Sequence, residues 1–510
     1  MKVSLHSQKE YERKIQKLER KTERLTEKCQ SKSKDLKYLK RRVKELRLSR
    51  DKWKAKNHAK ALKAKELKKR LKNKERVKRH HYSSLLIALC IKLRVQAGCS
   101  YRGICKILLI LRTSFALDLK QLPCSNTIEN WVSKMGYYCI EHAEEDLGSK
   151  EVCMIIDESF RQGNERLLLL LITAWQKEKQ EALSYDEVRV CYLGGKKGWN
   201  GEQISQEIEN IVAQKGIVIK NIVSDEDSKM LKVSRLLGCP HLPDINHAIA
   251  NCLRRTFEKD DTYQSLIKLI GSYQSKAVNQ ALSYLRPPKQ RVKARFMNQK
   301  DFVQWGLTML AKFECLNEKE KTFFAELPAY RPMLKILGWC IDLTEKVTKF
   351  LKASGLSWCS LRQVESYMGR PKQLVFKSCA QSKPQGNISY DNTAVLMEQF
   401  LDHLRGYLDQ YELFLNTHTG TFNVSSDIIE SMFGKHKSIS GTNTLVGVSQ
   451  LDLELPVHNM DPEAMNPLVK LALESVLMSD LKSWREAHCA DKQADKRRKF
   501  FKTSPHFRNF

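Results

Sequence analysis

Five segments between residues 151 and 223 decide the fold: EVCMII (151–156), RLLLLLITAW (166–175), EVRVCYL (187–193), EQISQEIENIVA (202–213) and VIKNIV (218–223). Four of them are short apolar runs, which is the pattern of strands buried in a sheet. The segment 202–213 instead spaces its isoleucines as on one face of a helix. The order strand, strand, strand, helix, strand predicts an α/β domain with a mixed sheet.

Two aspartates mark the ends of these strands. Asp157 directly follows the first strand, and Asp225 comes just after the fourth. If these two strands are parallel neighbours, their ends meet at one edge of the sheet and the two carboxylates lie side by side.

This region resembles the RNase H-like catalytic core of DDE transposases. The resemblance rests on IIDES with Asp157, NIVSDEDSKML with Asp225 and SSDIIESMFGKHKS with Glu430. It covers residues 83–270 and 415–450. It implies that Asp157, Asp225 and Glu430 are the catalytic residues and bind two Mg²⁺ or Mn²⁺ ions, with Glu430 on a helix that returns to the sheet after an insertion.

The chemistry explains why carboxylates are needed. Two divalent ions about 3.5–4 Å apart stabilise the attacking and leaving oxygens of a phosphodiester, and such hard ions prefer carboxylate oxygens. Glu158, Glu226 and Asp227 lie beside the two aspartates. Asp427 is three residues before Glu430, so both could face the metals. Glu430 is preferred because the Ser-x-Phe-Gly-Lys-x-Lys that follows it resembles the family.

Lysines near these acids are expected to contact DNA phosphates. Lys435 and Lys437 follow Glu430 directly. Lys196 and Lys197 belong to the glycine-rich loop 194–201, GGKKGWNG, which precedes a helix N-terminus and could hold a phosphate. The alternative for that loop is a flexible turn.

Asp244 and His247 form an Asp-x-x-His motif, which resembles a signature of several transposase superfamilies. The resemblance implies a supporting role near the active site, such as positioning a phosphate or water. The alternative for His247 is a structural histidine. Cys239, His241, His247 and Cys252 also allow a zinc site, but their spacing matches no finger or ribbon, so we do not predict one.

The basic residues gather at the N-terminus. Residues 1–80 hold 32 of the 89 lysines and arginines and 10 of the 58 acids, which is +22 of the formal +31. A spacing of alternately three and four residues selects Ile15, Leu18, Thr22, Leu25, Cys29, Lys32, Leu36, Leu39, Val43, Leu46, Arg50 and Trp53. Ten of these twelve are apolar or small, which predicts a basic coiled coil over 1–82 that dimerises through 15–53. Double-stranded DNA would supply the counter-charge.

A helix-turn-helix-like DNA-binding unit is predicted at 83–145. Helices are expected at 83–97, 101–112 and 126–134. Ser100 and Ser125 would be N-caps, and Gly98 and Gly136 would end the first and third helices. The third helix would present Asn126, Glu129, Asn130 and Lys134 to a major groove. An ordinary three-helix packing unit is the alternative.

The predicted domains follow in order. The RNase H-like core occupies 146–250 and 416–450, and an all-α insertion fills 251–415, because a structureless loop of that length is implausible in a compact domain. A C-terminal helical segment covers 451–489. Residues 490–510 are predicted to be a disordered basic arm or a localisation signal.

Composition excludes several classes of protein. A hydrophobic content of 42% allows real cores, and the longest apolar run is about half a membrane span. We therefore expect no membrane partner, and no secretory signal because MKVSLHSQKE lacks an apolar segment. Fifteen scattered cysteines favour a reducing compartment. The expected location is the cytoplasm or nucleoid of a bacterium, or the nucleus of a eukaryote.

Two hypotheses about function remain open. The first is a DNA transposase that cleaves and joins strands at transposon ends. The second is a domesticated, non-catalytic DNA- or chromatin-binding protein that descends from a transposase.

Overall fold

The computed structural model describes most of the chain. The described residues are 2–72, 77–115, 119, 121–161, 165–175, 183–279, 282–289, 296, 299–369, 390–440, 447–460, 463, 465–489 and 493–503. The chain divides into two compact units, Met1–Arg76 and Val77–Phe510. Each unit is described below by itself.

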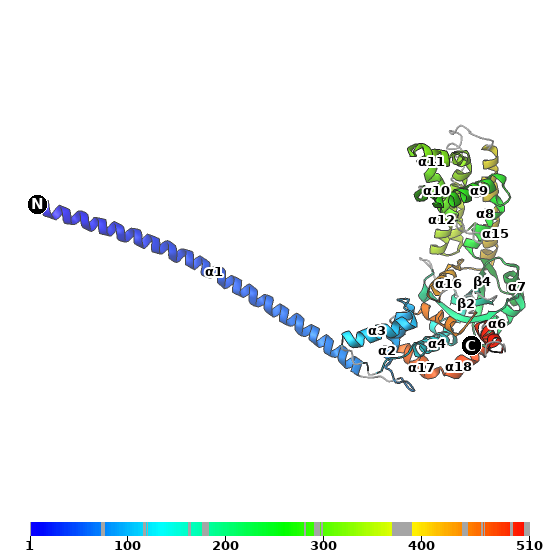
Figure 1. Cartoon of the computed structure of the whole chain (residues 1–510), viewed down its shortest axis with the longest axis horizontal. Helices are drawn as coiled ribbons and strands as arrows, with labels where there is room; N and C mark the ends of the chain where they lie inside the picture. Colours follow the sequence, from blue (N-terminus) through cyan, green and yellow to red (C-terminus); the bar gives the residue numbers. More distant parts are fainter. Residues whose placement is uncertain are drawn as a thin grey trace. The chain divides into compact units, whose positions relative to one another are not determined.

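The first unit is one continuous helix, α1 (Lys2–Lys72), drawn in blue in Figure 1. The predicted helix is confirmed as far as Lys72. Residues 77–82, which were also assigned to it, are not helical, and Val77 is buried in a core of the second unit. The apolar residues of the predicted coiled-coil seam are exposed in the single chain, from 46% at Val43 to 68% at Trp53. The helix therefore cannot bury its apolar stripe within itself. Its pairing with a second copy stays a prediction.

The second unit is a mixed α/β structure built on a five-stranded sheet. Its strands are β1 (Glu151–Arg161), β2 (Glu165–Ala174), β3 (Val188–Lys196), β4 (Val218–Ser224) and β5 (His241–Pro243). Their order is β3-β2-β1-β4-β5. β1 is antiparallel to β2 and parallel to β4, and β4 is parallel to β5. The four predicted strands are confirmed, but two of them end later than predicted. β1 continues to Arg161, so Asp157 lies within the strand rather than after it, and β3 includes residues 194–196, which were predicted to be a loop. The three-residue β5 was missed because it is too short to show a pattern.

Helices cover both faces of the sheet. Even-numbered residues of β1, such as Met154 and Ile156, pack with α6 (Gly201–Lys215) and α7 (Ser228–Leu237). Odd-numbered residues, such as Ile155, pack with α8 (Ile245–Phe257) and α16 (Asp427–Ser440). Because side chains alternate along a strand, this parity also fixes which face carries Asp157.

The helical unit before the sheet contains α2 (Ser84–Val95), α3 (Tyr101–Ser114) and α4 (Ser125–Glu141), with the short α5 (Ala143–Leu147) leading into β1. Ser100 caps α3 as predicted. Two details of the prediction for α4 were wrong. Cys124 rather than Ser125 is its N-cap, and the helix continues past Gly136 instead of ending there.

The reason for Gly136 is packing. A Cβ at this position would lie 1.6 Å from the carbonyl oxygen of Leu453. The glycine therefore allows α4 to lie directly against the short 3₁₀ helix η6 (Gln450–Glu454). A close backbone approach and a helix end both select glycine, so the sequence alone does not distinguish them.

The C-terminal helices complete earlier parts of the fold. α17 (Met465–Ser475) packs on α2 and α4. Val469 and Leu473 of α17 share a core with Ile91 and Trp131. α18 (Met478–His488) packs against α4 and β3. The segment predicted as a separate C-terminal piece is thus part of the helical layer beneath the sheet.

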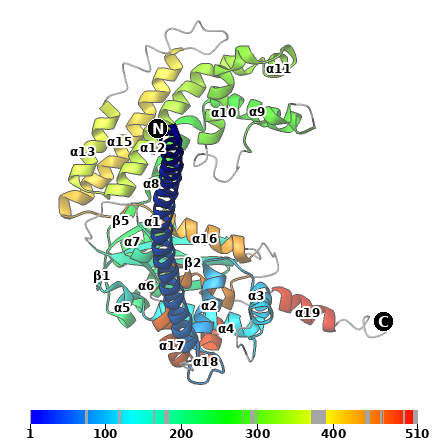
Figure 2. The same ribbon diagram turned by 90° about the vertical axis from the view of Figure 1, so that its left-hand side faces the viewer.

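The insertion is helical, as predicted. It consists of α9 (Asp261–Lys276), α10 (Lys300–Ala311), α11 (Glu318–Phe323), α12 (Arg331–Ser354), α13 (Trp358–Gly369) and α15 (Tyr390–Thr417). Both views show these helices at one end of the second unit and α2, α4, α17 and α18 at the other, with the sheet between (Figures 1 and 2). α8 and α15 run across the predicted limits of the insertion at 251 and 415.

Residues 493–503 of the basic tail form a helix, α19 (Gln493–Thr503). The prediction of a disordered arm was therefore wrong for this stretch. Among the described residues, no helix combines the length and the apolar character needed to cross a membrane.

Candidate active site at the carboxyl ends of β1 and β4

Asp157 and Asp225 meet where the pairing of the two central parallel strands ends. Ile155 of β1 pairs with Val223 of β4, so two residues further along each strand the register places Asp157 opposite Asp225. Ile155 and Val223 belong to one core, on the sheet face covered by α8 and α16. The alternation of side chains therefore directs both aspartates to that face.

The electrostatics show that these acids form one group. Burial and the nearby Asp225 carboxylate raise the pKa of Asp157 to about 7, and Glu430 contributes to the rise. Burial also raises the pKa of Asp225. Two like charges that are partly removed from water oppose each other's ionisation. The structure thus brings together the two predicted strand-end acids and the glutamate of α16.

Glu430 is held beside His247. The His247 Nε2 atom lies 3.4 Å from Glu430 Oε1. This contact is the main cause that raises the pKa of His247 to about 9 and lowers the pKa of Glu430. On α16, Ile429 and Met432 are buried in the core while the Glu430 side chain is 46% exposed. The helix therefore turns its apolar face to the sheet and its glutamate to the site.

Asp244 explains how His247 and Glu430 come together. This fully buried aspartate is the N-cap of α8. Its Oδ1 accepts hydrogen bonds from the backbone N–H groups of Asn246 (2.9 Å) and His247 (3.0 Å), and its Oδ2 accepts one from Ser426 (2.6 Å). One carboxylate thus joins the start of the histidine helix to the start of the Glu430 helix. The predicted supporting role of Asp244 is positional.

The neighbouring acids are occupied by other partners. Glu158 pairs with Lys229 (2.9 Å) and Arg166 (3.3 Å). Asp427 pairs with Lys352 and accepts a hydrogen bond from Asn246.

The other two competing acids beside Asp225 also have partners. Glu226 accepts a hydrogen bond from Asn251 (3.0 Å), and Asp227 lies 3.3 Å from Lys229. Among the described residues, Asp157 and Asp225 form no ion pair with a lysine or arginine. Glu430 also has a partner, His247, but it is close enough to Asp157 to raise the pKa of that aspartate, and no such effect of Asp427 is found. This difference favours Glu430 over Asp427.

The donor set fits a hard divalent cation. Asp157 and Asp225 are partly buried carboxylates whose pKa values are raised mainly by burial, and carboxylate oxygens are the ligands that Mg²⁺ and Mn²⁺ prefer. Within the described part of the chain, only His436, Glu454 and His458 bring three potential ligand atoms within 4.8 Å of one another. The potential ligand atoms of Asp157, Asp225 and Glu430 thus do not all lie within this distance of one another.

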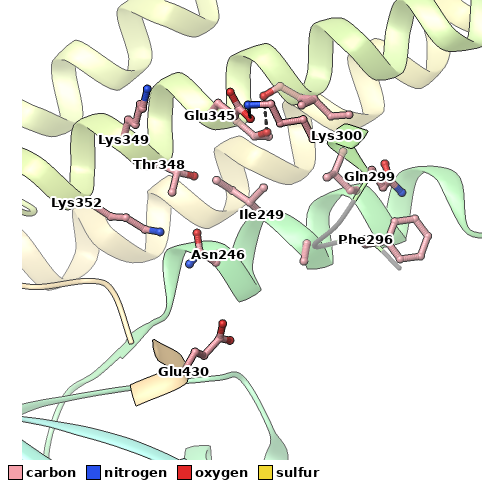
Figure 3. A pocket seen from close by; sticks show the side chains of 14 residues that line it. Asn246, Ile249, Phe296, Gln299, Lys300, Glu345, Thr348, Lys349, Lys352 and Glu430 are labelled. Atoms are coloured by element: carbon pink, nitrogen blue, oxygen red, sulfur yellow. Dashed lines mark hydrogen bonds and ion pairs between the residues drawn. The ribbon is translucent and has the colours of Figure 1, made fainter. Parts of the chain in front are cut away.

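A cleft of about 630 Å³ opens beside Glu430. It lies between α8, the start of α10 and α12, and Figure 3 shows Glu430 at one end of it. Lys349 and Lys352 of α12 and Lys300 of α10 line its walls. Lys300 is paired with Glu345. A second cleft of about 150 Å³ is lined by Asp157 and Asp225 themselves.

The predicted recognition helix is less exposed than expected. Asn126 is exposed, but Asn130 is half-buried and lies 3.3 Å from the side-chain amide of Gln450. Lys134 is only 7% exposed, and burial lowers its pKa. The prediction that Lys134 reaches DNA from an exposed face was therefore wrong, because α17 and α18 pack over that side of α4.

The remaining predicted phosphate contacts lie in two places. Lys196 is at the end of the edge strand β3, where it pairs with Glu207 (3.2 Å) and lies 4.2 Å from the centre of the Trp199 ring. Lys197 is exposed. Lys435 and Lys437 are on α16, and Lys437 is close enough to Glu430 to lower its pKa.

Sequence reasoning missed Lys352 and Asn246 as partners of Asp427. Asn246 lies inside the Asp-x-x-His motif, so its position was a usable signal, whereas Lys352 lies 75 residues from its partner. It also missed His436, which stands between the two predicted lysines of α16. Three of the four residues considered for zinc have other partners: His241 is bonded to Ser224 (2.9 Å), His247 lies beside Glu430, and the Cys239 thiol contacts the Ile219 carbonyl oxygen. Comparison of the sequence with protein-family models and with curated proteins gives no match.

Proposed function

We propose that this chain is a DNA transposase with an RNase H-like core, in which Asp157, Asp225 and Glu430 hold two Mg²⁺ or Mn²⁺ ions. The observation that supports the proposal is the proximity of Asp157 in β1, Asp225 directly after β4 and Glu430 of α16, where the pairing of the two parallel inner strands of the sheet ends. When bound, the two ions would stabilise the attacking and leaving oxygens of the cleaved phosphodiester.

The residues of the chain have separate tasks in this mechanism. Asp157 and Asp225 supply carboxylates from the rigid sheet, and Glu430 adds a third from α16. Asp244 holds the starts of α8 and α16 together. His247 is protonated at neutral pH, and its charge beside the acids suits the scissile phosphate.

We propose that the DNA duplex contacts the basic surfaces of the chain. The cleft beside Glu430 carries Lys349 and Lys352, which suit phosphate contacts near the cleaved strand. The basic helix α1 would add affinity that does not depend on sequence.

The test uses the genomic DNA that flanks the coding region as a labelled duplex. Wild type is expected to nick it with Mg²⁺ or Mn²⁺ and not with EDTA. Asp157→Asn, Asp225→Asn and Glu430→Gln should each lower the cleavage rate at least about 100-fold. Asp409→Asn is the matched control, because this exposed acid of α15 lines neither cleft; its rate should stay within about threefold.

The outcomes separate the two classes of protein. If wild type and Asp157→Asn show the same cleavage, the catalytic proposal fails. If the duplex is bound with salt-dependent affinity but never cut, the chain is a non-catalytic DNA-binding protein.

A further inference from the structure

A second cluster of potential metal ligands lies in the C-terminal half of α16 and the segment after it. His436 is on α16, Glu454 ends η6, and His458 is on the 3₁₀ helix η7 (Pro456–Asn459). Their side chains are 1%, 1% and 7% exposed. One ligand atom from each lies within 4.8 Å of the others.

Two of these ligands are already oriented by partners behind them. His436 Nδ1 lies 2.9 Å from Glu454 Oε1, while its Nε2 lies 2.9 Å from Asp452 Oδ1. The second carboxylate oxygen, Glu454 Oε2, accepts hydrogen bonds from Arg94 Nε (2.8 Å) and the Tyr101 hydroxyl (3.2 Å). Glu454 Oε1 accepts a further hydrogen bond from Arg94 Nη2 (3.1 Å), so Arg94 orients the whole carboxylate. A carboxylate behind a histidine is the usual device that fixes the ring of a metal ligand.

His458 supplies the independent observation. Both of its ring nitrogens are buried and have no hydrogen-bond partner among the described residues. Buried polar groups are almost always paired. A neutral imidazole keeps a lone pair on one nitrogen, which can bind a metal ion. An ion next to His436 and Glu454 would give this nitrogen a partner.

We propose that His436 Nδ1, Glu454 Oε1 and one ring nitrogen of His458 bind a single transition-metal ion of the Zn²⁺ class. Two imidazoles and one carboxylate suit zinc better than Mg²⁺, which prefers oxygen ligands. Binding expels the Nδ1 proton of His436 to solvent, and Asp452 keeps its contact with Nε2. The site uses none of the residues assigned to cleavage.

The alternative without metal is a protonated His436 that bridges Asp452 and Glu454. That arrangement balances the two carboxylates against His436 and Arg94. It leaves both nitrogens of His458 unpaired, however, which the metal site does not.

The proposed ion would have a structural effect. It would fasten the part of α16 that lies six residues beyond Glu430 to the segment 450–459. That segment packs on α4. The metal would thus hold the C-terminal half of the Glu430 helix against the helical layer.

The experiment uses the untagged full chain, purified without chelators and analysed by elemental mass spectrometry. One zinc per chain is expected for wild type, and about one for His81→Gln, an exposed-histidine control, and for Asp157→Asn. His458→Gln should lose the metal. Asp452→Asn should keep it with an affinity about 10–100-fold lower.

Cobalt titration keeps the test decisive if His458→Gln does not fold. Co²⁺ added to zinc-free wild type should give visible d–d absorption of a four- or five-coordinate site, saturating at one ion per chain. The proposal is overturned if wild type neither contains zinc nor produces this spectrum. It is also overturned if folded His458→Gln binds as much metal as wild type.

Discussion

At the scale of single residues, the pKa of Asp157 is the most informative property of the candidate site. Its carboxylate is at the end of a central strand pairing, where burial and Asp225 raise its pKa to about 7. A raised carboxylate pKa opposes folding once the unfolded chain has ionised. The ionised Asp157 carboxylate is therefore disfavoured first by its burial and second by repulsion from Asp225, and a bound cation would offset both.

Replacing Asp157 tests this unfavourable effect. The unfolded aspartate ionises near pH 3.8 and the folded one near 7, so its unfavourable effect grows between these values and is complete above pH 7. In EDTA at pH 8, Asp157→Asn should raise the free energy of unfolding by about 1–2 kcal/mol, discounted from the full linkage value because the group is partly solvated. Urea unfolding at pH 5.5 and 8 measures the difference, which should be smaller at pH 5.5.

The control for this prediction is Asp409→Asn, an exposed acid of α15 outside the site, which should change stability by less than about 0.5 kcal/mol. Added Mg²⁺ should stabilise wild type and not Asp157→Asn. A wild type that is more stable than Asp157→Asn in EDTA at pH 8 would contradict this unfavourable effect.

A different prediction concerns Asp244. Its carboxylate accepts three backbone hydrogen bonds and so connects the start of α8 to the start of α16. Asp244→Ala should lower the free energy of unfolding by about 3 kcal/mol, since it removes a cap and a charged partner from buried N–H groups. Asp260→Ala, at the N-cap of α9, should cost about 1 kcal/mol. Equal losses in the two variants, measured by urea unfolding, would show that the link to Ser426 carries no weight.

Residues of the site differ in how far the sequence could predict them. Asp157 and Asp225 were predictable because strand order and side-chain parity depend on local patterns. Glu430 needed the family resemblance, because its contact with His247 spans a long insertion. The pairing of Asp427 with Lys352 and the cluster of His436 with Glu454 depend on tertiary packing, for which no local pattern exists.

At the scale of elements, the strands and long helices followed from apolar periodicity, whereas helix ends did not. Gly136 is the clearest case. The sequence predicts the end of a helix there, whereas the glycine instead allows a close contact between α4 and η6. The missing information was the position of Leu453, more than 300 residues away in the chain.

This contact gives a sharp substitution test. Gly136→Ala should destabilise the protein by about 2–4 kcal/mol, because its Cβ would overlap a backbone carbonyl that cannot move without shifting η6. Gly406→Ala in α15 is the matched control, since a Cβ there meets nothing within 4 Å. That control should raise stability by about 0.5–1 kcal/mol through helix propensity. Thermal unfolding of both variants measures the contrast, and a neutral Gly136→Ala would contradict the packing.

At the scale of the whole molecule, the net positive charge and the candidate active site lie in different units. The first unit carries most of the net +31, while the second unit gathers the acids. A basic helix with an exposed apolar seam gains most if two copies pair, because the dimer presents the positive charge twice along one duplex.

The seam can be broken without changing the charge. The double variant Leu39→Ser with Leu46→Ser should be monomeric by analytical ultracentrifugation if residues 15–53 form the dimer, because serine removes two seam contacts. Its affinity for nonspecific duplex DNA should fall at least about tenfold at fixed salt, with a shallower salt dependence. Leu48→Ser removes an equally exposed leucine, 55% against 55% for Leu39, from outside the seam. It should leave both mass and affinity unchanged, and a monomeric wild type would show that α1 binds DNA as a single helix.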